Sequence, residues 1–298
     1  MDTEDLSFFA RVVRRGSISA AGRDVGLSAA TASARLIALE RRLGVRLLHR
    51  NTRGATVTED GAAFLPYVEA ILEATEVAMV ALGGGKAEPQ GTIRIAAPSS
   101  FGRMHLVPQL PSLLARYCGL HLDLRLSDTV VDLVEGAFDL AIRNAAPADS
   151  TLIGRKLAPD RRQLVAAPSY LARRGMPADP SQLSAHECLV LGALNVWTLA
   201  TPRGAKSFKV RGRVRIDDGA AIRDAAVAGL GITLMSTWAA GEALRRGELV
   251  VVLPDFPVVT DHAIWALYPS SRLLSPKVRV VIDHLAECFG PKPYWDEP

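Results

Sequence analysis

Two helices joined by a tight turn, and followed by a short basic hairpin, are predicted between residues 15 and 60. Ser17 or Ser19 can cap the first helix, because a serine hydroxyl accepts hydrogen bonds from the unpaired N–H groups of a first turn. Ser28 can cap the second helix in the same way, and Gly44 is typical of the position just beyond a helix end. This pattern favours a winged helix-turn-helix, and it constrains the fold more than any other feature of the chain.

The second helix of this motif has two faces of different character. One apolar stripe should face a core, and it comprises Ala32, Leu36, Leu39 and Leu43. The opposite face is free to enter a DNA groove, and it centres on Ala30, Ala34, Ile37 and Arg41. From this face and the hairpin we predict DNA contacts at Ser28, Ala29, Ala30, Thr31, Ser33, Ala34, Arg35, Arg50 and Arg53. The alternative is an ordinary helical pair with a solvated arginine face.

The positive charge of the chain is concentrated near its start. Residues 1–60 carry ten arginines and seven acidic residues, whereas the rest of the chain carries 25 basic and 24 acidic side chains. Most of the formal net charge of +4 therefore lies in the first fifth of the sequence. Binding to DNA phosphates requires such an excess, so the charge distribution favours DNA binding over a merely solvated face.

A long amphipathic helix is predicted over residues 59–82. Its apolar residues alternate steps of three and four, which is typical of a coiled-coil seam. Pro66 can kink or tighten the start of the helix. The helix either pairs with a second copy of the chain or lies on its own domain. We predict pairing, through Phe64, Leu65, Val68, Ile71, Leu72 and Met79.

Several stretches resemble the LysR-type transcriptional regulators. The stretches GSISAAGRDVGLS, ALERRLGVRLLHR and NTRGATVTEDG are similar to the DNA-binding region of that family. The stretches LRLSDTVVDLVEGAFDLAIR, RDAAVAGLGITLM and YPSSRLLSPKVRVVIDHLAE look like its effector domain. The resemblance covers nearly all 298 residues in the expected order. It implies a sequence-specific regulator that binds double-stranded operator DNA as a homodimer or homotetramer, contacts RNA polymerase, and joins its DNA-binding domains through the linker helix.

Strands and helices alternate from Thr92 onward, which predicts α/β units with a mainly parallel sheet. The resemblance implies that the last strand and helix return to the first of two lobes, with a cleft between the lobes. The expected fold is an N-terminal all-α winged helix-turn-helix followed by a two-lobed α/β effector domain like that of periplasmic binding proteins. The expected boundaries are 1–58 for the winged helix, 59–82 for the linker, 83–91 for a hinge, 92–160 and 267–298 for the first lobe, and 161–266 for the second lobe.

Polar residues follow three predicted strands of the effector domain, at the strand ends where open α/β sheets bind ligands. Serine hydroxyls, an arginine and bare helix N-termini favour an anion, so we expect a small carboxylate effector. The predicted contacts are Ser99, Ser100, Phe101, Asp128, Arg143, Asn144, Trp197, Gly219 and Ala220. By resemblance, the two serines, Arg143 and the Gly219 segment match effector-contact regions of LysR-type proteins. Alternative roles are helix capping for the serines and Asp128, an interlobe salt bridge for Arg143, and core packing for Trp197.

Other classes of protein fit the sequence less well. A solute-binding protein would not need the first 90 residues, and the acidic start MDTEDLSFFARVV does not resemble an export signal. An enzyme is disfavoured because the sequence has no GxSxG, P-loop or HExxH motif. The three cysteines lie far apart and form neither a disulfide framework nor a metal cluster. No apolar run approaches the roughly 20 residues that cross a membrane. We therefore expect a cytoplasmic protein without enzyme activity, cofactor, metal or membrane partner.

Overall fold

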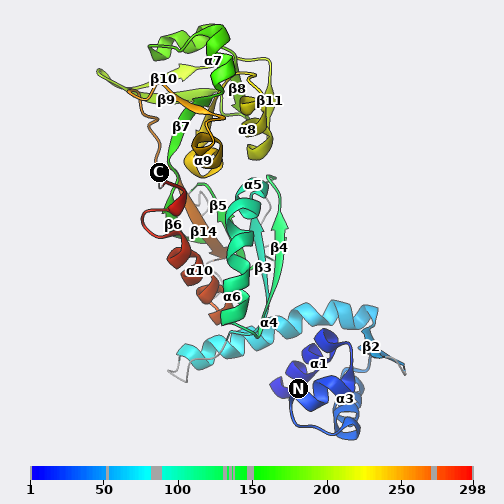
Figure 1. Ribbon diagram of the computed structural model, residues 1–298. Coiled ribbons are helices and arrows are strands. Elements are labelled where there is room, and N and C mark those ends of the chain that lie inside the picture. Colours follow the sequence, from blue (N-terminus) through cyan, green and yellow to red (C-terminus); the bar gives the residue numbers. More distant parts are fainter. Residues whose placement is uncertain are drawn as a thin grey trace. The chain divides into compact units, whose positions relative to one another are not determined.

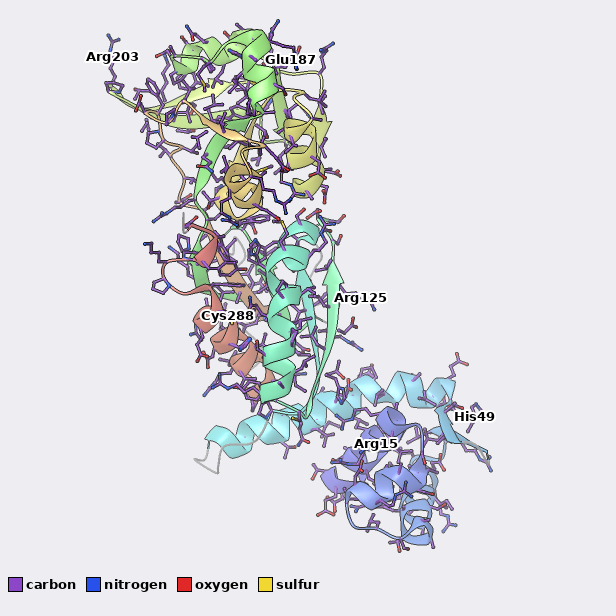
Figure 2. All side chains as sticks on the ribbon, viewed as in Figure 1. Arg15, His49, Arg125, Glu187, Arg203 and Cys288 are labelled. Carbon is purple, nitrogen blue, oxygen red and sulfur yellow. The ribbon has the colours of Figure 1, made fainter. Side chains whose placement is uncertain are left out.

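The computed structural model describes residues 2–51, 54–81, 89–129, 133, 136, 138–145, 151–269 and 274–296. Met1–Gly91 and the short segment Leu273–Pro276 form one compact unit, and the rest of the chain forms a second. The first unit is called the head and the second the effector domain. Figure 1 shows the secondary structure of each unit, and Figure 2 adds the side chains.

The head consists of a helix-turn-helix, a β-hairpin and a long helix. Its elements are α1 (Thr3–Arg15), α2 (Ile18–Asp24), α3 (Ala29–Leu43), β1 (Leu48–Asn51), β2 (Gly54–Val57) and α4 (Glu59–Ala81). The Ser17 hydroxyl caps α2 and the Ser28 hydroxyl caps α3, with N–H···O distances of 3.3 and 3.1 Å. Gly44 ends α3 at a φ of 73°, which glycine adopts readily. The predicted caps are thus confirmed, with Ser17 rather than Ser19 at the start of α2.

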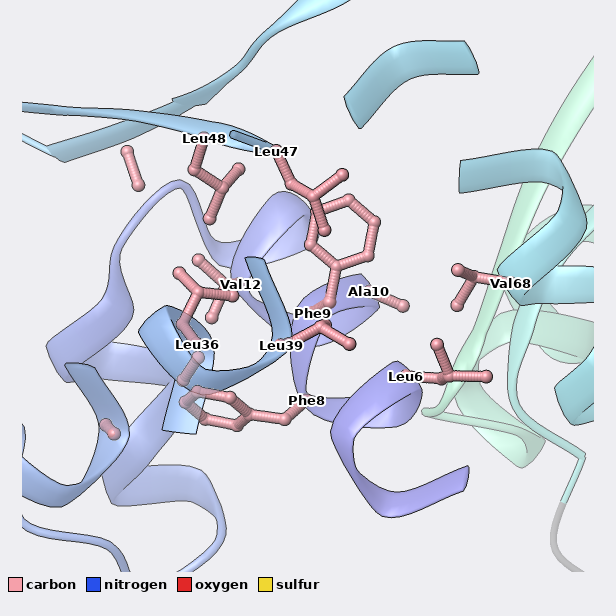
Figure 3. Close-up of a cluster of buried hydrophobic side chains, with 13 residues drawn as sticks. Leu6, Phe8, Phe9, Ala10, Val12, Leu36, Leu39, Leu47, Leu48 and Val68 are labelled. Atoms are coloured by element: carbon pink, nitrogen blue, oxygen red, sulfur yellow. The ribbon is translucent and has the colours of Figure 1, made fainter. Parts of the chain in front are cut away.

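The apolar stripe of α3 is buried in the core of the head. Ala32, Leu36 and Leu39 are at most 1% exposed, and they pack against α1. Figure 3 shows this cluster, to which α1 contributes Leu6, Phe8, Phe9, Ala10 and Val12. The prediction that this stripe faces a core is confirmed.

Helix α4 packs against the head's own core, whereas the sequence predicted a seam that faces a second copy. Val68 is fully buried there, and Figure 3 shows it reaching toward α1. Phe64, Leu65 and Leu72 are partly buried against the same core. The pairing role predicted for Val68 was wrong, because the three-four spacing of a coiled-coil seam also covers a domain core. The helix continues without a break through Pro66.

Each lobe of the effector domain is built on a five-stranded sheet. The first sheet has the order β4-β3-β5-β14-β6 and consists of β3 (Gly91–Ala97), β4 (Leu120–Leu126), β5 (Leu140–Arg143), β6 (Leu152–Pro159) and β14 (Ala263–Pro269). The second has the order β11-β8-β12-β7-β13 and consists of β7 (Arg162–Ala166), β8 (Cys188–Leu191), β11 (Arg215–Ile216), β12 (Ile232–Ser236) and β13 (Val250–Val252). A separate antiparallel hairpin consists of β9 (Val196–Thr201) and β10 (Gly204–Lys209).

The two sheets are mixed rather than mainly parallel, which corrects the expectation from the sequence. β3 is parallel to β5, and β8 is parallel to both β11 and β12. β14 is antiparallel to β5 and β6, and β7 is antiparallel to β12 and β13. The chain path explains this, since β6 leads out of the first lobe and β14 returns beside it in the opposite direction. Because β14 begins at Ala263, the return comes before the expected boundary at residue 267.

Helices cover both sheets. The first lobe has α5 (Ser99–Phe101), a π-helical turn (Gly102–Leu106), a 3₁₀ turn (Val107–Gln109), α6 (Leu110–Arg116) and α10 (Pro276–Phe289). The second lobe has α7 (Pro168–Arg174), a 3₁₀ turn (Pro180–Ala185), α8 (Gly219–Val227) and α9 (Thr237–Arg245), and a last 3₁₀ turn follows at Tyr294–Asp296. Most of the helix expected over residues 130–137 lies outside the described residues. Among those described, no helix has the length and apolar character to span a membrane.

Candidate DNA-binding and effector sites

The face of α3 that the sequence assigns to DNA is exposed. Its exposed residues are Ala29, Ala30, Thr31, Ala34, Ile37 and Arg41, and Ser33 beside them is partly buried. The Ser28 hydroxyl is occupied by the cap and by a 2.9 Å hydrogen bond with the Thr31 hydroxyl. The face is therefore mostly apolar, and few of its side chains can form hydrogen bonds with base edges.

Arg35 is turned toward α1 instead of toward the exposed face. Its guanidinium donates to Asp5 and to Glu4, both at 2.8 Å, and Arg42 also pairs with Asp5. Burial acts to raise the pKa of Asp5, but the bonds to the two arginines outweigh it and hold that pKa below its usual value. The predicted DNA contact at Arg35 is thus corrected, because this side chain fastens α3 to α1 and fixes the direction of α3.

The hairpin of β1 and β2 forms the wing, and it is tied to the rest of the head. The two strands pair antiparallel, and the Ala55 N–H donates to the Gly16 carbonyl at 2.8 Å. A hollow of about 590 Å³ between α3 and β1 is lined by Ile37, Glu40, Arg41, Gly44, Val45, Arg46 and Leu48. Arg53 and the side chain of Arg50 lie outside the described part of the chain.

Hydrogen bonds join the two lobes where β3 ends and α8 begins. The Ala220 N–H donates to the Ser100 hydroxyl at 2.9 Å, and this hydroxyl donates to Asp218 at 3.4 Å. Asp218 also caps α8 by accepting from the Ala221 N–H at 2.6 Å. A Cβ on Gly219 would lie 3.4 Å from the Ser100 hydroxyl, so the lobes approach closely here. Ser100 and Ala220, both predicted to bind the effector, thus bond to each other and connect the lobes.

Two partly buried polar side chains at the end of β5 each have a buried atom without a hydrogen-bond partner in the described part of the chain. Nη2 of Arg143 and Oδ1 of Asn144 form no hydrogen bond within the described residues. Burial lowers the pKa of Arg143, and the charge of Asp128 opposes that shift. Burial raises the pKa of Asp128, the Ser99 N–H at 3.0 Å opposes the rise, and the Asp218 carboxylate adds to it. A buried donor and a buried acceptor without partners are the groups that a polar ligand can satisfy.

Two aromatic residues predicted to bind the effector are packed inside the domain instead. Trp197 is 1% exposed in the core of the second lobe, where its indole N–H donates to the Leu194 carbonyl at 3.0 Å. Phe101 is fully buried and contacts the rings of His105, Trp238, Phe289 and Trp295. Both predictions are corrected, because burying a large ring stabilises the fold more than leaving it in a wet cleft.

The rings around Phe101 form an aromatic cluster that joins both lobes to the C-terminal segment. Its members are Phe101, His105, Trp238, Phe289, Tyr294 and Trp295. The His105 ring nitrogens lie 2.7 Å from the Tyr294 hydroxyl and 3.2 Å from the Trp238 carbonyl. Burial lowers the pKa of His105 to about 4. The sequence did not identify this cluster, because it joins helices that are far apart along the chain.

Asp218 is a second residue that the sequence analysis missed. It belongs to the stretch DDGAAIRDAAV, where an acidic residue precedes a run of helix-forming residues. The preference of aspartate for the N-cap position was the available signal. That signal locates the cap, but it does not indicate that the same carboxylate reaches Ser100 of the other lobe.

Comparison with known proteins agrees with this architecture in both units. Residues 3–62 match the bacterial regulatory helix-turn-helix protein model of the lysR family, and residues 86–289 match the LysR substrate binding domain. The chain belongs to the LysR family of transcriptional regulators. It is therefore a DNA-binding regulator with a substrate-binding domain and is not an enzyme.

Individual relatives of this LysR-type regulator match over nearly the whole chain. The HTH-type transcriptional regulator DmlR of Escherichia coli is 36% identical over 290 residues, which cover 96% of this chain and 94% of the relative. The activator TtdR of Escherichia coli is 33% identical over 287 residues, which cover 95% of this chain and 92% of that one. The structure of CrgA from Neisseria meningitidis has a TM-score of 0.63 at 29% identity, and it covers 96% of this chain and 98% of CrgA. Full-length AphB from Vibrio cholerae has a TM-score of 0.60 at 32% identity, with 96% and 99% covered.

Proposed function

We propose that this regulator responds to a small carboxylate that binds where the two lobes meet, with Arg143 as its main partner. The buried Nη2 of Arg143, which has no hydrogen-bond partner in the described chain, carries the proposal. A buried guanidinium nitrogen without a hydrogen-bond partner is costly, and a carboxylate offers a planar pair of acceptors that matches a guanidinium. The side-chain oxygen of Asn144 can accept a hydrogen bond from a hydroxyl or N–H group of the same ligand, while the Ser99 N–H holds Asp128 in place.

The hydrogen bond from Ala220 to Ser100 supplies a way for the ligand to act on the lobes. A ligand changes the state of a protein only if it binds one arrangement better than another. A carboxylate on Arg143 would lie near Asp128, whose charge acts on that arginine. Asp128 in turn interacts with Asp218, which bonds to Ser100 of the other lobe. We infer that binding shifts the balance between lobe arrangements through these bonds.

A thermal-shift screen of small organic acids on the full chain tests the proposal. Arg143→Ala should weaken the best ligand by roughly 10- to 150-fold, because a hydrogen bond to a charged group contributes about 1.5–3 kcal/mol. Ser100→Ala should weaken it less. Arg125→Ala is the matched control, because this arginine is largely exposed at the end of β4 and pairs with Asp123. A cationic best ligand, or equal binding by Arg143→Ala and the parent, would show that the assignment is wrong.

We also propose how the head meets DNA. The exposed alanines of α3, with Thr31 and Ser33, would lie in the major groove, where methyl groups contact thymine. Arg50 and Arg53 of the wing would bind the phosphate backbone and read the shape of the minor groove. Binding of operator DNA is the reason to place the protein in the cytoplasm, and contact with RNA polymerase is proposed from the family resemblance alone.

The exposed face of α4 is the proposed pairing surface of two heads. It comprises Ala63, Tyr67, Ala70, Ile71, Ala74 and Ala78, of which Tyr67 is 69% exposed and Ile71 is 37% exposed. Ile71→Asp should bury an unpaired charge in the dimer and reduce operator binding by at least an order of magnitude. Sedimentation measures the pairing of the heads and DNA titration measures operator binding, with the exposed Glu59→Asp as a control. If the Ile71→Asp protein pairs normally, this face of α4 is not the pairing surface.

A further inference from the structure

A stretch of the second lobe far from the head in sequence is strongly basic. Residues 201–216, TPRGAKSFKVRGRVRI, contain six basic side chains and no acidic one. Three of these, Arg203, Lys206 and Lys209, lie on the β9–β10 hairpin, and Figure 2 shows Arg203 at its tip, directed away from the lobe. The last four basic residues of the stretch define the basic ridge, which comprises Lys209, Arg211, Arg213 and Arg215.

The basic ridge runs from the end of β10 to the start of β11, and its charged side chains face solvent. All four of its basic residues are exposed, while Val210 is 3% exposed and Val214 and Ile216 are partly buried. The four cations alternate with Val210, Gly212 and Val214, so the ridge presents four charged side chains to solvent within seven residues.

The backbone of the ridge is fixed against β8. The Cys188 N–H donates to the Arg211 carbonyl at 3.0 Å, and the Val190 N–H donates to the Val214 carbonyl at 3.2 Å. Gly212 allows this approach, because a Cβ there would lie 2.0 Å from the Cys188 carbonyl oxygen. The row of cations is thus held in place before any partner binds, which lowers the entropy cost of binding.

Little negative charge compensates the ridge. Arg213 pairs with Glu187 at 3.3 Å, and within the described chain Lys209, Arg211 and Arg215 form no ion pair. Protection of a sheet edge against pairing with other chains is the simpler explanation of exposed charges on a strand. It accounts for Arg215 on the edge strand β11 and for Lys209 on β10 of the two-stranded sheet, but Arg211 and Arg213 lie in no strand.

We propose that the basic ridge is a second, sequence-independent contact surface for the phosphate backbone of duplex DNA. Four exposed cations within seven residues suit a polyanion, because each cation that neutralises a phosphate releases a counterion. The regulator already binds duplex DNA through its head, and DNA is therefore the polyanion that this chain meets. The ridge adds affinity without adding sequence preference.

The test measures how the affinity of the full chain for a long mixed-sequence duplex depends on salt. The triple variant Lys209→Gln, Arg211→Gln, Arg215→Gln leaves Arg213 and its ion pair intact. It should lower the slope of log K against log salt by about 0.9 for each phosphate that is no longer neutralised, which is about 2.7 in all. The matched control is Arg103→Gln, Lys156→Gln, Arg245→Gln, which removes the same charge from scattered exposed positions and should leave the slope unchanged.

Two further variants make the outcome decisive. Arg211→Lys with Arg215→Lys should keep the parent slope, because a phosphate contact requires the charge rather than the guanidinium shape. Arg53→Gln in the wing should lower the slope by about 0.9 and reports on the head separately. Equal slopes for the triple variant and its control overturn the proposal. If the triple variant instead forms larger oligomers with an unchanged slope, the ridge only protects the sheet edge and the proposal is likewise overturned.

Discussion

The head and the effector domain place their functional groups by different kinds of contact. In the head, one helix with its own caps presents the DNA-binding face, and the ion pairs of Arg35 fix that helix on α1. In the effector domain, the bonds of Ser100 to Ala220 and Asp218 join residues 120 and 118 positions apart, and they cross between lobes. The DNA-binding face is therefore present in any folded head, whereas the effector site depends on how the lobes are arranged.

The largest expected effect comes from removing a buried side chain from the core of the head, which tests whether the head and the effector domain unfold separately. Leu39→Ala should destabilise the head by about 2–5 kcal/mol, because a fully buried leucine leaves a cavity. Thermal unfolding of the full chain should then show an earlier transition for the head and an unchanged one for the effector domain. Equal shifts of both transitions would show that the two units are not energetically separate. Ile37→Ala on the exposed face of α3 is the control.

Acid should weaken the effector domain through His105 more than it weakens the head. Burial holds the pKa of His105 at about 4 in the folded protein, against 6.5 for a free histidine. The unfolded chain therefore takes up the proton first, so stability is complete above about pH 6.5 and falls by about 3 kcal/mol as the pH drops toward 4. The His105→Gln variant should lose most of this dependence of stability on pH, which thermal unfolding between about pH 7 and pH 5 measures. The control His121→Gln, at an exposed position, should keep the pH dependence of the parent. If the His105→Gln variant also keeps that dependence, His105 does not destabilise the domain in acid.

The smallest expected effect concerns base readout by the head alone. Ser33→Ala should change the preferred base at one or two operator positions, since a good base contact contributes about 1–3 kcal/mol of discrimination. Sequence selection from a random library compares the two motifs, and Ser19→Ala on α2 serves as the control. Identical motifs for Ser33→Ala and the parent would leave Ser33 with no part in readout. Effector affinity should be the same in all three proteins.

The sequence predicted the features that depend on neighbouring residues. The caps at Ser28 and Gly44 and the buried stripe of α3 follow from rules that act within a few positions. The alternation of strands and helices after Thr92 was also predicted, but β6, β13 and α9 were not, and the region of β9 to β11 was interpreted as irregular.

The errors share one physical cause. Val68 and Trp197 were assigned to surfaces, although both are buried in the core of their own unit. An apolar stripe or a large ring has the same sequence pattern whether it faces a partner, a ligand or a core. Arg35 illustrates the same limit for charges, because its partners Asp5 and Glu4 lie on another helix. Only the fold determines which side a residue faces.

The aromatic cluster has a consequence for the synthesis of the protein. Tyr294 and Trp295 come after every strand and α-helix of the described chain, yet their rings pack against Phe101 and His105 near the start of the effector domain. A chain emerging from the ribosome can complete its head early, since domains fold as units in the order of synthesis. The aromatic cluster is complete only when residues near 295 have been made. A message cut short before that point would therefore yield a finished DNA-binding head attached to an effector domain that lacks its last packing residues.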